Sequence, residues 1–151
     1  MSLQQKIDYS INLLRRAEPM ALRMSDKGFF LAFSGGKDSQ CLYHIAKEAG
    51  VKFEAHYQLT TLDPPELVYF IREHYPDVII NRPRYTFLQL CEKKGMLPTR
   101  VARFCCAELK ETTGEGTATL IGIRRAESKK RAKRNEVEIS GHKFSGSLDQ
   151  F

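Results

Sequence analysis

The chain has 151 residues, of which 42% are hydrophobic and 28% are charged, as is ordinary for a single globular domain. No apolar run approaches the roughly 20 residues that span a bilayer, and the first residues lack the apolar core of a signal peptide. We therefore expect a cytoplasmic protein with no membrane partner, whose four cysteines are thiols or ligands rather than disulfides. The net charge of +6 favours an anionic partner.

Helices and strands are predicted to alternate along the first two thirds of the chain. Apolar residues at helical spacing predict a helix over residues 3–24. A strand starts at Gly28, and the next helix ends at Gly50, a typical C-terminal stop. Asp63 is expected to cap the third helix. The remaining predicted elements here are a helix over 39–49, a strand over 51–59, a fully buried strand over 78–80 and a helix over 86–94.

The last third is predicted to continue in the same way. Residues 105–110 are expected to form a helical turn, residues 117–123 a strand rich in β-branched side chains, and residues 125–134 a basic helix. A short strand is expected at 137–139. The chain then ends without a terminating element, so we expect it to stop before the natural protein does.

This alternation predicts a three-layer α/β/α fold with a mostly parallel sheet, of the Rossmann-like kind. We expect an N-terminal helix over 1–27 that packs on the domain, a nucleotide-binding domain over 28–134 and a C-terminal tail over 135–151. Ligands in such folds bind beyond the carboxyl ends of the strands.

The clearest motif is SGGKDS, which follows the first predicted strand and opens a helix. Adjacent glycines let an anion reach the main-chain amides, and the helix directs its unpaired N–H groups to the same point. A tight turn with an incidental lysine is the simpler alternative. The spacing matches neither the Walker A loop nor the dinucleotide fingerprint. The phosphate-binding candidates are Ser34, Gly35, Gly36, Lys37, Asp38 and Ser39.

This loop resembles the SGGxDS loop of the adenine-nucleotide alpha-hydrolase superfamily, which includes ATP pyrophosphatases (PP-loop enzymes) and the phosphoadenosine phosphosulfate (PAPS) reductases. A second segment, TTLDPPE from Thr60, resembles the D-T-G-x-x-F-P-E-T segment of the PAPS reductase family. That resemblance implies a nucleotide contact at Thr60, although the family's D-T-G is replaced by Thr60, Thr61 and Leu62. The alternative is simply a well-formed helix start.

A third segment, CCAELK, resembles the C-C-x-x-x-K segment of adenylyl-sulfate reductases, in which tandem cysteines hold half of a 4Fe–4S cluster. Cys105 and Cys106 take that place here. No cysteine follows Cys106, so this chain does not complete a cluster alone. Two small buried residues are the simpler interpretation, and thiols of lowered pKa beside Arg103 and Lys110 are another.

A fourth segment, GIRRAESKKR from Gly122, resembles the family's G-x-R-x-x-x-S-x-x-R segment, whose arginines bind phosphate or sulfate. Arginine grips such oxyanions with paired N–H groups. The resemblance assigns this role to Arg124, Ser128 and Arg131, with Arg125 in support.

Together these resemblances imply an oxidoreductase-type protein of sulfur metabolism that binds an adenylyl-sulfate nucleotide for thiol-dependent reduction to sulfite, with a thioredoxin-like reductant. The chain matches none of the family's late E-C-G-L-H segment, so no catalytic nucleophile is assigned. The main alternative is an ATP pyrophosphatase-type sulfurtransferase that uses Mg²⁺ beside Asp38 and acts on tRNA or DNA. A third is a non-catalytic nucleotide-binding module, such as a phage accessory protein. Self-association is compatible with each.

Overall fold

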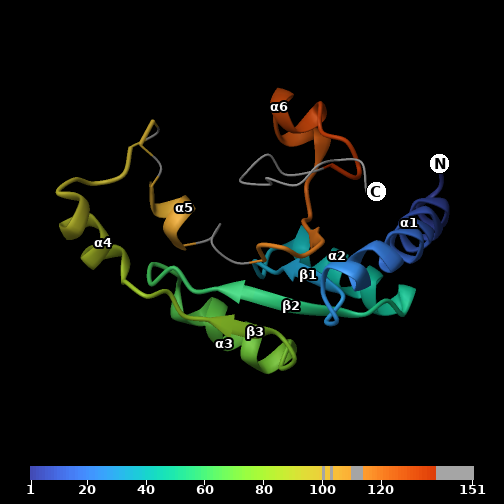
Figure 1. Ribbon diagram of the computed structural model, residues 1–151, viewed down its shortest axis with the longest axis horizontal. Helices are drawn as coiled ribbons and strands as arrows, with labels where there is room; N and C mark the ends of the chain where they lie inside the picture. Colours follow the sequence, from blue (N-terminus) through green and yellow to red (C-terminus); the bar gives the residue numbers. More distant parts are fainter. Residues whose placement is uncertain (100, 103, 110–113, 139–151) are drawn as a thin grey trace.

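The computed structural model describes residues 1–99, 101–102, 104–109 and 114–138 (Figure 1). The element order confirms the predicted alternation. The elements are α1 (Leu3–Met24), β1 (Phe29–Ala32), α2 (Lys37–Ala49), β2 (Phe53–Gln58), α3 (Pro65–His74), β3 (Ile79–Asn81), α4 (Phe87–Lys94), α5 (Phe104–Leu109), β4 (Thr119–Leu120), the 3₁₀ turn η1 (Arg125–Glu127) and α6 (Lys129–Ala132).

The described strands form one four-stranded sheet in the order β3-β2-β1-β4, and all of its pairs are parallel. This confirms the predicted Rossmann-like α/β fold. In β1, Leu31 pairs with Ala55 on one side and with Leu120 on the other. The chain therefore moves outward from β1 to β3 and then returns to the other side of β1. The carboxyl ends of β1 and β4 flank the point at which the strand order reverses, where ligands of such folds bind.

The hydrophobic core lies between the sheet and the first three helices. Leu31 of β1 and Ile71 of α3 are fully buried, and they belong to one cluster with Leu14 of α1 and Ala46 of α2. Helix α1 lies against α2 (Figure 1). Phe30 points to the opposite face of the sheet, where its ring stacks on the ring of His56. The first three helices therefore pack on the same side.

Gly50 ends α2 in the left-handed conformation, as its position in the sequence predicted. Thr86 caps α4 in a reciprocal capping box with Gln89, and Gly95 ends that helix in the left-handed conformation. The predicted helix over 3–24 and the predicted helical turn near Cys105 are also present. These features depend on residues close in the sequence, as capping and C-terminal glycines do.

Four expectations were wrong, each because of local or tertiary context. Asp63 does not cap α3, because its carboxylate accepts hydrogen bonds from Thr60 instead. Strand β3 is not fully buried, since it lies at the edge of the sheet and leaves Ile79 exposed. The predicted basic helix is interrupted at Ser128, whose backbone is extended and whose hydroxyl caps α6. Residues 137–138 form no strand, and Ile139 lies outside the described residues.

Across the described part of the chain, no helix combines the length and the hydrophobicity needed to cross a membrane.

Gly28 and Lys52, the residues that directly precede β1 and β2, lie very close together, and this contact leads to a testable prediction. Gly28 has φ +78°, and a Cβ there would lie 2.1 Å from the carbonyl oxygen of Lys52. We expect Gly28→Ala to lower the free energy of unfolding by roughly 3 kcal/mol or more, since a backbone clash adds to left-handed strain. Urea denaturation measures this change.

Gly50→Ala is the matched control. Gly50 has φ +68°, but a Cβ there meets nothing within 4 Å. Only the backbone strain remains, so we expect a loss of about 1 kcal/mol. Equal losses in the two variants would contradict the packing explanation.

Candidate phosphate-binding site

The SGGKDS loop connects the carboxyl end of β1 to the start of α2. Gly36 is the N-cap residue of α2, and no side chain caps the amides of that helix. Gly35 has φ +76°, and a Cβ there would lie 2.6 Å from Leu67 Cδ1 of α3. The backbone conformation therefore favours glycine at this position, and any larger residue would also displace the end of the Leu67 side chain. The amides at the start of α2 are arranged as in anion-binding helix termini.

Ser39 holds the loop from inside. Its side chain is buried, and its hydroxyl donates to the Gly36 carbonyl oxygen at 2.9 Å. Ser39 Oγ in turn accepts hydrogen bonds from the Ser34 amide and the Ser34 hydroxyl, both at 3.2 Å. Ser34 and Lys37 are exposed at the loop surface. The two serines thus differ, since Ser39 stabilises the loop while Ser34 and Lys37 lie where a ligand has access.

The fold brings Arg124 to the loop. A Cβ on Gly122 would lie 3.0 Å from the backbone carbon and oxygen of Asp38, so the segment after β4 runs against the start of α2. Two residues later, Arg124 Nε lies 3.0 Å from Asp38 Oδ2. This places the predicted oxyanion-binding arginine beside the predicted phosphate loop, at the reversal of strand order.

The Glu127 carboxylate joins two arginines of the basic segment. Glu127 pairs with Arg124 at 3.5 Å and also forms an ion pair with Arg131. Ser128 is exposed, and its hydroxyl accepts from the Arg131 amide at 3.1 Å. The side chain of Arg125 lies outside the described residues. Asp38 and Glu127 therefore occupy the guanidinium groups that an incoming anion would use.

Thr60 lies in a turn at the carboxyl end of β2, one strand away from the loop. Its amide and hydroxyl donate to Asp63 Oδ2 at 2.6 and 2.8 Å, and its side chain is buried. The next residue, Thr61, has φ +67°, which is unusual for a β-branched residue. Burial and the nearby Asp63 carboxylate raise the pKa of Tyr57 beneath this turn. The turn is thus a tightly bonded structure of its own.

The cysteine pair shows no cluster site among the described residues. Cys105 is half-buried on α5, whereas the side chain of Cys106 lies outside the description, as do Arg103 and Lys110. No group of three or more His, Cys, Asp or Glu side chains gathers in the described part of the chain. These residues do not fit a 4Fe–4S cluster, which needs four ligands.

Two features of the site had no signal in the sequence. The first is the ion pair between Asp38 and Arg124, which lie far apart in the chain. The second is Gln40, whose amide nitrogen donates to the Gly35 carbonyl oxygen at 2.7 Å. Gln40 follows the SGGKDS motif directly, but only the structure shows that its side chain turns back to the loop.

The comparison with protein families gave one match. The model of the phosphoadenosine phosphosulfate reductase domain matches residues 28–145. This match covers more than half of the chain and includes the loop, the turn at Thr60, the cysteine pair and the segment after β4. No curated protein and no solved structure matched the chain.

The buried hydroxyl of Ser39 generates a prediction. Ser39→Ala removes the group that joins Ser34 to Gly36 and leaves their polar atoms without this partner. We expect the free energy of unfolding to fall by about 1–3 kcal/mol, measured by urea denaturation. Ser10→Ala is the control, because its exposed hydroxyl donates only to the Lys6 carbonyl oxygen on α1. We expect a change within about 0.5 kcal/mol there, and equal losses would contradict the assigned role.

Proposed function

The chain belongs to the phosphoadenosine phosphosulfate reductase domain family, and from this premise we propose that it binds an adenylyl-sulfate nucleotide through residues 34–39, for thiol-dependent reduction to sulfite. The observation that carries the proposal is the meeting of the loop with Arg124 at the reversal of strand order. One side supplies helix amides and Lys37, and the other supplies a guanidinium group.

The two sides suit different parts of such a nucleotide. The amides at the start of α2 and Lys37 would bind the phosphosulfate group. Arg124 would bind the terminal sulfate or the 3′-phosphate, with Arg131 and Arg125 in support. Binding requires Arg124 to exchange the Asp38 carboxylate for the ligand's oxyanion. This exchange is inexpensive, because the Arg124 side chain is about half exposed and exposed ion pairs contribute little.

The proposed reduction uses two thiols. A thiolate attacks the sulfate sulfur, a sulfur–sulfur bond forms, and the bond from sulfur to the phosphate oxygen breaks, so that the nucleotide leaves. A second thiol then attacks the sulfur atom of the first thiol. The bond between the two sulfur atoms of the intermediate breaks, sulfite leaves, and the two thiols are joined as a disulfide. Two electrons pass from the thiols to the sulfur atom, and a thioredoxin-like reductant regenerates the thiols in the reducing cytoplasm. No residue of this chain is assigned as the nucleophile.

The Mg²⁺-dependent alternative has less support. A sulfurtransferase that adenylates tRNA or DNA would use Asp38 beside a metal ion. The family match is to the phosphoadenosine phosphosulfate reductase domain instead. The ion pairs of Asp38 with Arg124 and of Arg131 with Glu127 would have to open for either kind of ligand, so binding measurements have to separate the two functions.

Calorimetric titration tests the proposed ligand. We expect the wild-type chain to bind phosphoadenylyl sulfate or adenylyl sulfate more tightly than ATP with Mg²⁺. Arg124→Gln should weaken that binding about 10- to 100-fold, since it removes charged hydrogen bonds. Arg134→Gln is the control, because Arg134 pairs with Glu138 rather than with the loop. Tight binding of ATP with no response to either sulfated nucleotide would overturn the proposal.

Asp38→Asn separates the two chemistries. This variant removes the Asp38 carboxylate that competes for Arg124 and leaves only the longer contact to Glu127, so affinity for the sulfated nucleotide in Mg²⁺-free buffer should rise a few-fold. Glu48→Gln, at the exposed far end of the same helix, changes the net charge equally and should leave affinity unchanged. A loss of affinity in Asp38→Asn that appears only with Mg²⁺ and ATP would instead support the metal-dependent alternative.

A further inference from the structure

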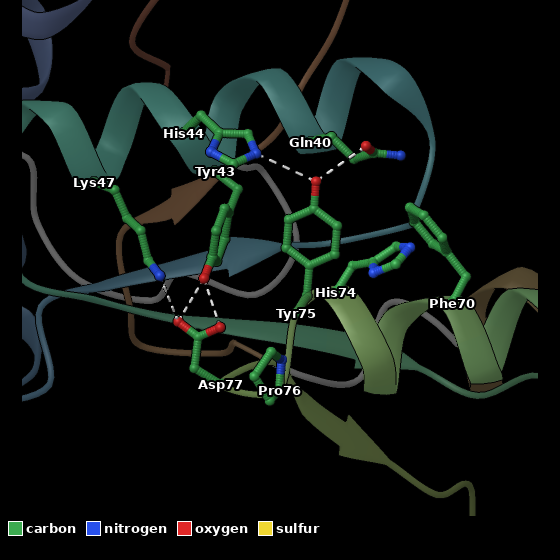
Figure 2. A pocket seen from close by; sticks show the side chains of 9 residues that line it. All are labelled: Gln40, Tyr43, His44, Lys47, Phe70, His74, Tyr75, Pro76 and Asp77. Carbon is green, nitrogen blue, oxygen red and sulfur yellow. Dashed lines mark hydrogen bonds and ion pairs between the residues drawn. The ribbon is translucent and has the colours of Figure 1, made fainter.

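An open groove of about 750 Å³ lies between α2 and the end of α3. Figure 2 shows Gln40 and His44 reaching into it from α2, and Tyr75 standing between them from the end of α3. Tyr75 is the C-cap residue of α3 and is buried. Its ring packs on Phe33 at 4.8 Å between centroids, so its hydroxyl is held in one place.

A chain of hydrogen bonds runs from this groove to the phosphate loop. His44 Nε2 lies 3.3 Å from the Tyr75 hydroxyl, which donates to Gln40 Oε1 at 3.0 Å (Figure 2). The other end of the Gln40 amide, Nε2, donates to the Gly35 carbonyl oxygen at 2.7 Å. Because the oxygen and the nitrogen of the amide both have partners, its orientation is determined.

The Gly35 carbonyl belongs to the peptide unit that carries the Gly36 N–H. A peptide unit is planar and trans, so its C=O and N–H groups point in opposite directions. Two adjacent glycines give the backbone little resistance to rotation of this unit. A hydrogen bond to the carbonyl oxygen therefore determines where the Gly36 N–H points. The Gly36 N–H has only a long contact of 3.4 Å, to Ser34 Oγ, and lies at the N-cap of α2.

We propose that Gln40 and Tyr75 are positioning residues of the phosphate loop, which orient the Gly35–Gly36 peptide so that its N–H is presented to the bound anion. Gln40 acts on the loop directly, and Tyr75 acts through Gln40. The inference rests on the proposed function only in that the ligand carries a phosphate group on this loop.

The same groove contains a second network that serves as an internal control. The Tyr43 hydroxyl donates to the Asp77 carboxylate at 2.5 Å, and Lys47 Nζ lies 3.1 Å from Asp77 Oδ2. Burial and the hydrogen bond to Asp77 raise the pKa of Tyr43. Tyr43 packs against Tyr75 with 5.1 Å between the ring centroids. The Tyr43 hydroxyl group therefore points toward Asp77 and away from Gln40.

The test compares Gln40→Met, Tyr75→Phe, the double variant and Tyr43→Phe. Calorimetric titrations use phosphoadenylyl sulfate and, separately, inorganic pyrophosphate. We expect Gln40→Met to weaken binding about tenfold and Tyr75→Phe about threefold, as for single hydrogen bonds. The double variant should match Gln40→Met, because Tyr75 acts only through Gln40. Tyr43→Phe should bind as the wild type does. Additive losses, or equal losses in Tyr75→Phe and Tyr43→Phe, would overturn the proposal.

The ligand-free protein supplies an independent measurement. The amide resonance of Gly36 should shift in Gln40→Met and in Tyr75→Phe and stay in place in Tyr43→Phe, and an unchanged Gly36 resonance in Gln40→Met would overturn the positioning role. The two proposals fail differently. Pyrophosphate binding that depends on Gln40, without binding of the sulfated nucleotide, would reject the proposed substrate and support the positioning residues.

Discussion

The parallel pairing of β1 with β4 is the constraint on which the candidate site depends. Phe30 pairs with Thr119, so two segments distant in the sequence leave the sheet at adjacent points. The backbone at Gly122 then runs so close to Asp38 that a methyl group would be crowded there. Without this pairing the SGGKDS loop would be a helix start with a lysine, and Arg124 would be a surface residue. With it, an anion at the loop lies between helix amides and a guanidinium group.

Ion pairs connect the SGGKDS loop to the segment after β4. Asp38, Arg124, Glu127 and Arg131 form a continuous series of ion pairs from the loop to α6. Their side chains are partly exposed, so the pairs contribute little to folding. They do keep four charged groups ordered at one place. An incoming oxyanion would therefore meet guanidinium groups that are already near the loop. It would have to displace carboxylates from them, but it would not have to order the arginine side chains.

Local chemistry explains what could be predicted from the sequence. The glycines of the loop and the stop at Gly50 act on neighbouring residues, and their patterns correctly predicted the helix that lies between them. The errors came from context. Asp63 has the composition of a helix cap, but its carboxylate is taken by the turn at Thr60. The charge of the basic segment gave no indication that Ser128 would interrupt its helix.

The loop is held from three directions by groups of different sequence origin. Ser39 holds it from inside, Gln40 and Tyr75 hold it from the groove between α2 and α3, and the segment at Gly122 closes its third side. Leu67 fills the space that a side chain at position 35 would need. The motif alone predicts an anion site, whereas these long-range contacts determine the shape of the loop and the arginine that lies beside it.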